Sequence, residues 1–468
     1  MSRINQNISS LQAMRSLNKN NMDLSTRLQR LSTGLRINTG KDAPAGLIAS
    51  EKLRSEMAGI SQAVDNTTRA SNVVNTAEGA LNEVSSQLLE LQSLTVEAAN
   101  TGALSQDEIN ANQLQVDSII NSINRIANNT QFGGRKLLNG SLGYNTSGVA
   151  TSSIAALTVN TAKLPDNGNM QVNIVVTNSA ELAAVGYTGG ALVSAATIEI
   201  AGINGTEQIS LGAGASVSAI RDAINQYTTS TGVSAVVSGT DLRLNSTAYG
   251  DTQFVSVRSL AGTFVPTVNR DAGVDATVSI NGVQAQVDGK VASIRTDQLD
   301  LTVDLSSAFA ADTTNSKTIF ITGGGMKFQI GSEVSRPGQF NLGLNSVASS
   351  QLGNGVTGYL STLLTGGTNS LVSGNTTQAQ KILTQSINQV SELRGRLGAL
   401  QKNVFETNIN SLGVTLENVT ASESAIRDAD FAKETAALTR AQILAQANTS
   451  VLAQANAIPQ QVLSLLGR

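Results

Sequence analysis

The sequence predicts an α+β protein, in which the N- and C-terminal regions form a long α-helical coiled coil or bundle and a β-rich central insert separates them. Residues 1–140 and 376–468 carry apolar residues at the three-and-four spacing of helices that pack along one seam. The residues between them are rich in Ser, Thr, Gly and Val and contain short alternating apolar runs, as strands do. Helical ends around a strand-rich middle predict termini that pair and an insert that projects between them.

The first helix is expected within residues 1–45. Its a and d heptad positions are Met14, Leu17, Leu24, Leu28, Leu31 and Leu35, with Asn21 as a polar a position. A seam this narrow is buried only against another seam, so the helix requires a partner. The following run, Gly34 to Asp42, superficially resembles a phosphate-binding loop but lacks its glycine spacing and its Ser or Thr. We interpret it as a helix end and a turn, with Pro44 closing the helix.

Four further seams follow along the chain. They are Val74, Leu81, Leu88 and Thr95 with Ala77, Val84, Leu91 and Ala98; Val116, Ile119, Ile120, Ile123 and Ile126; Leu383, Val390, Leu397 and Val404; and Leu444, Val451, Ile458 and Leu465. For the seams at 74–98 and 383–404 we favour a helical bundle within one molecule. The helices at the two termini have narrow stripes flanked by Asn, Gln and Ser, so we expect them to pack against other subunits.

The central insert contains one fairly complete β-α-β-β unit near 195–262. A turn at Ile203-Asn204-Gly205 joins its first two strands, and Ser216 is the expected N-cap of its short helix. The sequence Asn281-Gly282 begins a degenerate second unit near 274–320, without a convincing helix. A last β segment is expected at 326–330, before the C-terminal helices.

Composition excludes several classes of function. The chain has no Cys, His or Trp, so a Ser-His-Asp triad, a Cys nucleophile and a His-ligated metal site are all impossible. Asp428 and Asp430 precede the last helix, where we expect them to cap it rather than to catalyse. We therefore expect no catalytic, cofactor-binding or metal-binding residues, and no enzyme.

Charge and hydropathy exclude two partners. The net charge of −3 gives no reason to expect nucleic acid, and no apolar stretch is long enough to span a membrane. The start of the chain lacks the apolar segment of a secretory signal peptide. If the protein leaves the cell, another export route must carry it.

At both ends the chain closely resembles bacterial flagellins. The matching runs are STGLRINTGKDAPAGLIASEKLRS (32–55), NTAEGALNEV (75–84), LTVEAAN (94–100), QFGGRKLLNGS (131–141) and the whole of 417–468, from ENVTASESAIRDADFAKE to PQQVLSLLGR. The resemblance covers about 1–140 and 376–468, in order and at both termini. The unit at 195–262 is similar to an insertion repeat of some flagellins.

The resemblance implies a structural subunit that polymerises into the bacterial flagellar filament for motility. Residues 1–45 and 421–468 would form a terminal coiled coil in the filament core, disordered in the monomer. Residues 46–149 and 321–420 would form a helical wall domain with a β segment, and 150–320 a surface-exposed insert. The packing residues of the coiled coil would be Leu17, Leu24, Leu28, Leu31, Leu35, Leu444, Val451, Ile458 and Leu465.

The implied partners are other copies of the chain, the flagellar cap and hook-junction proteins, and an export chaperone at the C-terminus. The protein would be secreted by the flagellar type III apparatus and located in the bacterial flagellum. Two alternatives remain: a hook–filament junction protein of the same family, and an exported adhesin that acts through the insert.

The resemblance also marks three positions at which many flagellins contact the innate-immune flagellin receptor. This chain has Glu90 where a cation is usual, keeps Leu94, and has Asp117 where Glu is usual. An anion in place of a cation would reverse a charge pair, so recognition by the receptor is expected to be weak.

Overall fold

The computed structural model describes residues 6–165, 168–296, 298–355 and 357–466, with the backbone alone for 462–466. The chain forms two compact units. The first comprises Met1–Arg69, Gln329–Gly338 and Val404–Arg468, and the second comprises Ala70–Phe328 and Gln339–Asn403. The long helices at both termini and the antiparallel strands between them confirm the predicted α+β fold.

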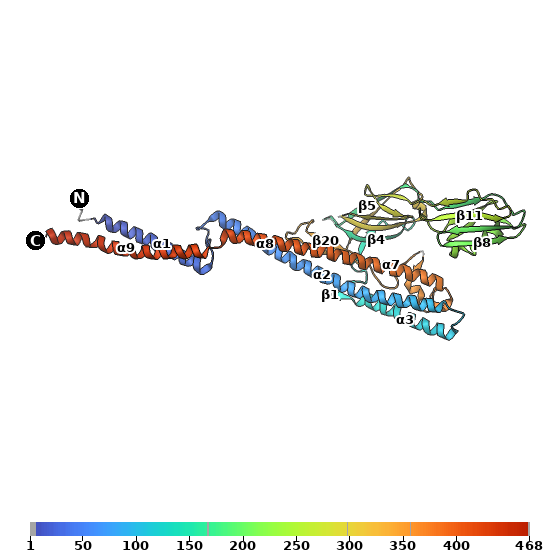
Figure 1. The fold of residues 1–468 in the computed structure, drawn as a ribbon, viewed down its shortest axis with the longest axis horizontal. Coiled ribbons are helices and arrows are strands. Elements are labelled where there is room, and N and C mark those ends of the chain that lie inside the picture. Colours follow the sequence, from blue (N-terminus) through green and yellow to red (C-terminus); the bar gives the residue numbers. More distant parts are fainter. Residues whose placement is uncertain (1–5, 166–167, 297, 356, 467–468) are drawn as a thin grey trace. The chain divides into compact units, whose positions relative to one another are not determined.

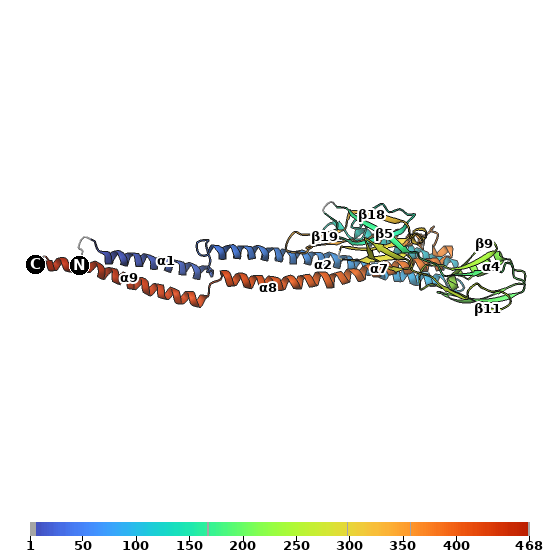
Figure 2. The ribbon, with the colours of Figure 1, turned by 90° about the horizontal axis from the view of Figure 1, so that it is seen from above.

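The first unit is built from helices. They are α1 (Ile8–Thr33), the first half of α2 (Pro44–Ala98), α8 (Thr407–Arg427) and α9 (Phe431–Leu466). The side chain of Asn7 caps the start of α1 by accepting from the backbone of Ser10, and Gly34 ends the helix in the left-handed conformation with φ 72°. Pro44 opens α2, so the prediction that it closes the first helix was wrong. The first helical position suits proline because its N–H would have no partner there. In both views α1 and α9 lie side by side (Figures 1 and 2).

A loop, Gln329–Gly338, packs against α2 in the first unit. A Cβ atom on Gly59 would lie 2.8 Å from the carbonyl oxygen of Ser332, closer than a real side chain allows. Asn408 on α8 donates to the hydroxyl of Thr67 at 3.1 Å and to the carbonyl of Ile330 at 2.9 Å. The loop therefore packs closely against α2 because Gly59 has no side chain, and the side-chain amide of Asn408 links the loop, α2 and α8.

The helical part of the second unit is a bundle within one molecule. Its elements are the rest of α2, α3 (Gln106–Asn129), α7 (Thr376–Leu400), and the 3₁₀ turns η1 (Leu360–Leu363) and η2 (Leu371–Ser373). The predicted seams are buried here, which confirms for α2 and for most of α7 that they belong to a helical bundle within one molecule. The buried seam residues are Val74, Leu81, Leu88, Thr95, Ala77, Val84, Leu91, Ala98, Val116, Ile120, Ile123, Leu383, Val390 and Leu397. Arg394 on α7 donates to Glu78 on α2 at 2.8 Å.

The heptad on α7 does not continue to Val404. A π-helix, Gln401–Glu406, follows α7, and within it Phe405 is fully buried while Val404 is only half-buried. A π-helix winds fewer degrees per residue, so it moves the apolar seam by one position. The prediction that the seven-residue repeat reaches Val404 was therefore wrong.

The strands form two lobes in the second unit. In the lobe near 184–272 the sheets are β12-β11-β7-β8 and β6-β10-β9, from β6 (Ala184–Tyr187), β7 (Ala196–Gly202), β8 (Gly205–Leu211), β9 (Val233–Ser238), β10 (Asp241–Ser246), β11 (Phe254–Ala261) and β12 (Arg270–Ala272), with helices α4 (Val217–Asn225) and α5 (Thr228–Thr231). Ile220 and Ile224 of α4 belong to its core.

The other lobe contains the remaining long strands. Its sheets are β14-β13-β5-β18-β3 and β15-β16-β17-β4, from β3 (Tyr144–Ser147), β4 (Ile154–Ala162), β5 (Met170–Asn178), β13 (Thr277–Ile280), β14 (Val283–Gln284), β15 (Gln286–Asp288), β16 (Val291–Arg295), β17 (Leu299–Leu305) and β18 (Ser316–Gly324), with α6 (Ser307–Ala310). Short pairs complete the chain: β1 (Gln131–Phe132) with β2 (Arg135–Lys136), β19 (Met326–Gln329) with β20 (Gln339–Leu342), and β21 (Gly353–Asn354) with β22 (Gly358–Tyr359).

The hairpin turn predicted at Asn281-Gly282 is confirmed, whereas the turn of the first unit consists of Ile203 and Asn204, with Gly205 already in β8 and paired with Gly202. Asn281 and Gly282 both have positive φ, 50° and 82°, between the paired residues Ile280 and Val283. Two such residues make the primed turn whose twist matches a hairpin. Ser216 caps α4 by accepting from the backbone of Ala219.

The packing at Gly59 gives a first prediction. Gly59→Ala is expected to lower the free energy of unfolding by about 1–2 kcal/mol, because the new methyl group must displace the Ser332 backbone. Gly79→Ala is the matched control: it lies on the same helix with nothing near its Cβ, so better helix propensity should raise stability by about 0.5–1 kcal/mol. Urea unfolding followed by circular dichroism measures both. Equal stabilisation by the two substitutions would contradict the packing.

Candidate functional site

The two terminal helices form an antiparallel pair. Near one end, Asn7 donates to the carbonyl of Ala455 at 2.7 Å, and near the other, Arg27 donates to Glu434 at 2.8 Å. The pair is held by a thin seam: in the part of α1 and α9 described with side chains, the buried residues are Ala13, Ala441, Ala455 and Glu434. Small side chains bring the two helices together but bury little apolar surface.

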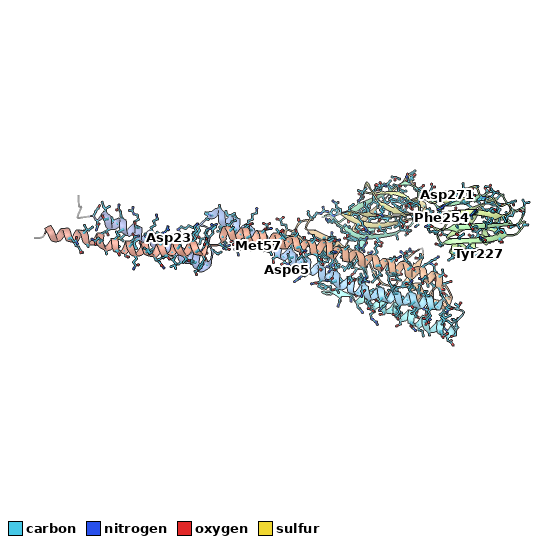
Figure 3. The ribbon with its side chains drawn as sticks, viewed as in Figure 1. Asp23, Met57, Asp65, Tyr227, Phe254 and Asp271 are labelled. Atoms are coloured by element: carbon cyan, nitrogen blue, oxygen red, sulfur yellow. The ribbon has the colours of Figure 1, made fainter. Side chains whose placement is uncertain are left out.

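The buried carboxylate in this seam is kept ionised by its partners. Burial alone would raise the pKa of Glu434, but hydrogen bonds from Arg27 and Arg30 outweigh it, and the pKa lies below its usual value. The hydrogen bond to Glu434 also raises the pKa of Arg27. Asp23, labelled in Figure 3, is a second, exposed partner of Arg27 at 3.2 Å.

The predicted seam residues of the first helix divide into two groups. Leu17, Leu24 and Leu31 are half-buried in the α1–α9 pair, whereas Leu28 is exposed. Leu35 lies beyond the end of α1, half-buried, where it forms a β-bridge with Asp428.

The predicted seam residues of the last helix do not face α1 in the single chain. Leu444, Val451 and Ile458 are 44%, 56% and 47% exposed. Leu465 lies outside the residues whose side chains the structure describes. Sequence reasoning chose the stripe of larger side chains and missed Ala441 and Ala455, although both also stand at heptad spacing. Packing of the larger stripe against other copies stays a prediction.

The pair therefore leaves a broad apolar surface uncovered in the single chain. The exposed large apolar residues are Ile8, Leu11, Met14, Met22 and Leu28 on α1, and Phe431, Ile443, Leu444, Val451 and Ile458 on α9. On α9, three of these recur at every seventh residue, which places them on one face. Exposed apolar residues gathered on one face of a helix are typical of sites that bind another protein chain.

The positions at which the resemblance implies receptor contact lie in the second unit. Glu90 is exposed on α2, and Leu94 is buried. Asp117 is half-buried: its carboxylate accepts from the backbone and hydroxyl of Thr365, at 2.9 and 2.6 Å, and from Gln113 at 2.9 Å. Sequence reasoning treated Asp117 as a surface charge, and no local signal indicated that it anchors the loop between η1 and η2.

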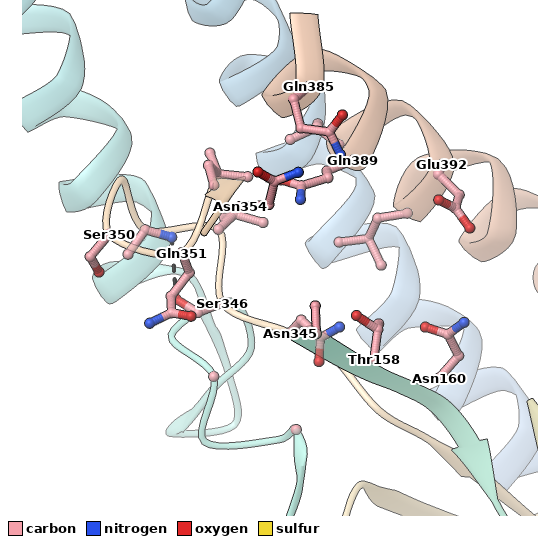
Figure 4. Close-up of a pocket in the computed structure, with 18 of the residues that line it drawn as sticks. Thr158, Asn160, Asn345, Ser346, Ser350, Gln351, Asn354, Gln385, Gln389 and Glu392 are labelled. Carbon is pink, nitrogen blue, oxygen red and sulfur yellow. Dashed lines mark hydrogen bonds between the residues drawn. The ribbon is translucent and has the colours of Figure 1, made fainter. Parts of the chain in front are cut away.

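A cavity of about 1220 Å³ lies in the second unit, between α7 and β4 (Figure 4). Gln385 and Gln389 line it from α7, and Thr158 and Asn160 from β4. The side-chain oxygen of Asn160 has no hydrogen-bond partner among the described residues. These carboxamides and hydroxyls hold water well. Two carboxylates also line the cavity, and each is paired with a cation: Asp304 with Lys290 at 2.6 Å, and Glu392 with Arg295 at 3.8 Å. In the described part of the chain, no cluster of Asp and Glu is suited to a metal ion, and no helix is both long and apolar enough to cross a membrane.

Comparisons with known proteins identify the terminal regions. The family model described as the bacterial flagellin N-terminal helical region matches residues 4–142, the bacterial flagellin C-terminal helical region matches 380–466, and the flagellin hook IN motif matches 197–248. Flagellin B of Vibrio cholerae is 30% identical over 466 residues, and polar flagellin B/D of Vibrio parahaemolyticus is 31% identical over 468 residues; each alignment covers 99% of both chains. A flagellin of Salmonella typhimurium is 30% identical over 526 residues with the same coverage.

Similarity to solved structures is weaker. The flagellar hook associated protein-3 of Legionella pneumophila aligns with 80% of this chain and 98% of its own, at 12% identity and a TM-score of 0.32. A likeness at this level does not bear on fold or function.

The hydrogen bonds of Asp117 give a second prediction. Asp117→Ala is expected to lower the free energy of unfolding by about 1–3 kcal/mol, because three donors lose their acceptor. Glu90→Ala is the matched control, since an exposed carboxylate on α2 should change stability by less than about 0.5 kcal/mol. Thermal unfolding of the two variants measures the difference. Equal stabilities would show that Asp117 does not hold the Thr365 loop.

Proposed function

The chain belongs to the bacterial flagellin family and is a structural subunit of the flagellar filament, and from this premise we propose that copies of it polymerise through the apolar residues that α1 and α9 leave exposed. The observation that carries the proposal is the exposed heptad of Leu444, Val451 and Ile458. A second copy packed over these side chains would bury their exposed apolar surface, which favours association.

The thin α1–α9 seam supports the same proposal. A helix pair that buries chiefly alanines gains little free energy against the conformational entropy of ordering two long helices. We propose that the terminal helices are disordered in the soluble monomer and become ordered when other copies pack against them. The packing residues in the polymer would then be those predicted from the heptads, including Leu28 and Leu35.

The proposed domain organisation follows from these surfaces. Residues 1–45 and 421–468 would form the inner core of the filament, and 46–149 with 321–420 the surrounding wall. The insert, 150–320, would face outward, because each of its two lobes already has a closed apolar core of its own.

The remaining partners are proposed on the same chemistry. The flagellar cap and hook-junction proteins would meet the polymer at its ends, and an export chaperone would cover the apolar face of α9 before assembly. The family is structural, and we propose that this chain has no catalytic activity, is secreted, and needs no cofactor. Curated relatives that bear the name flagellin over the full chain favour a filament subunit over a hook–filament junction protein or an adhesin.

Polymerisation through the α9 stripe can be tested directly. Val451→Ser combined with Ile458→Ser is expected to raise the critical concentration for polymerisation at least about tenfold, because each lost apolar contact is worth about 1.5 kcal/mol or more. Seeded growth, followed by light scattering and electron microscopy, measures it. Gln446→Ser with Gln454→Ser, both exposed on the same helix, should polymerise as the wild type does. Wild-type growth by the Val451 and Ile458 variant would refute this surface.

Receptor recognition is proposed to be weak, because Glu90 presents an exposed anion where a cation is expected. In a cell-based receptor assay, the wild-type chain should signal poorly and Glu90→Arg should signal more strongly at equal dose. Glu56→Arg, an exposed charge reversal elsewhere on α2, controls for net charge and should change nothing. Strong signalling by the wild-type chain would contradict the proposal.

A further inference from the structure

The seam between α1 and α9 repeats itself along its length. On α1, Leu17, Leu24 and Leu31 occupy the same half-buried position in successive heptads. On α9, Ala441 and Ala455 are both buried and lie two heptads apart. The heptad position between them is Asn448, which is half-buried. If one helix slid past the other by seven residues, the leucines of α1 would keep their heptad spacing and the apolar area in the seam would change little. The apolar seam alone therefore does not select one register of the pair.

Glu434 breaks this repeat. It occupies the position one heptad before Ala441, is 7% exposed, and is the only acidic residue in the sequence of α9. One of its oxygens accepts from Arg27 at 2.8 Å, and the other accepts from Arg30 at 3.2 Å. Both cations come from α1, so the carboxylate is satisfied only by residues of the facing helix.

A shifted register would remove these cations. If α1 moved by one heptad in one direction, Asn20 and Asp23 would take the places of Arg27 and Arg30, and Glu434 would face a second carboxylate. Movement in the other direction would bring residues beyond the last turn of α1 to those places. A buried carboxylate without a cation is strongly unfavourable, whereas the apolar contacts would change little.

We propose that Glu434 is the residue that sets the register of α1 against α9. The hydrogen bond from Asn7 to the carbonyl of Ala455 fits the same register. This bond also favours that register, because Pro459, four residues further along α9, has no N–H and leaves the Ala455 carbonyl without its helical donor. In the native register, the attraction between Glu434 and the two arginines is offset by the cost of removing these charges from water. The role of the triad is therefore to exclude other registers rather than to add net stability. The inference concerns pairing within one chain, and it stands or falls independently of the α9 stripe.

The absence of cysteine from the sequence makes the register measurable. One heptad from Arg27 and Glu434 along the pair, Asn20 stands opposite Ala441. Asn20→Cys with Ala441→Cys therefore reports the native register. Ala13→Cys with Ala441→Cys reports the shifted register in which Asp23 approaches Glu434. Each variant is oxidised as soluble protein and within polymers grown with an excess of the cysteine-free wild-type chain, and intrachain disulfides are quantified on denaturing gels. Excess wild-type chain incorporates variants that polymerise poorly and suppresses disulfides between chains.

Within the polymers, where the terminal helices are ordered, the native pair in the wild-type background should cross-link at least about tenfold more than the shifted pair. Glu434→Gln, and Glu434→Ala, which extends the alanine repeat, should bring the two yields within about threefold of each other. Asp23→Asn is the matched control: it removes the exposed partner of Arg27 and should preserve the native preference.

Two results would overturn the proposal. An unchanged native preference in both Glu434 variants would mean that the apolar seam or the Asn7 hydrogen bond sets the register. Loss of both cross-links in those variants would mean that the carboxylate holds the helices together and does not choose between registers.

Discussion

The thinness of the seam between α1 and α9 is the constraint on which the behaviour of the chain depends. Two helices of this length bury Ala13, Ala441 and Ala455 between them, and turn Leu444 and Val451 outward. Most of the apolar surface is then not available to stabilise the pair inside one chain. This surface remains available to other chains. The outward-facing residues that contribute nothing to the α1–α9 pair in one chain can therefore stabilise contacts between chains.

The helices of the second unit show the opposite arrangement. Along α2, the side chains of Leu81 and Leu88 are fully buried. The facing seam of α7 consists of Leu383, Val390 and Leu397, and it is buried as well. A broad seam of branched residues supports a bundle without further partners. The same seven-residue period therefore gives a stable bundle in the second unit and a weakly packed pair at α1 and α9. The size of the side chains at the facing positions decides between these two outcomes.

Much of this fold could be predicted from the sequence, because its local signals are strong. The buried face of α2, the Ser216 cap and the Asn281-Gly282 turn each follow from short-range patterns. Other features depend on contacts between distant segments. The π-helix that buries Phe405 in place of Val404 has no local signature, and neither does the hydrogen bonding that draws Asp117 toward Thr365. The side of α9 that meets α1 was not identified from the sequence, for a related reason. Periodicity reveals that a stripe exists, but it does not say which of two stripes meets the helix from the same chain.

The contrast between those two stripes of α9 has a physical logic. If the leucine and valine stripe faced α1, the pair would be stable alone, and the alanine stripe left outside would offer other chains little apolar surface. With alanines inside, the backbones of α1 and α9 approach closely and the larger side chains stay outside. A seam of alanines cannot also define the register, because one alanine resembles the next. An ionised group that finds its cations at a single place along the seam can define the register without adding bulk to the seam. Glu434 between Arg27 and Arg30 has this property. Weak pairing inside the chain and strict pairing geometry are therefore compatible, since different residues govern each.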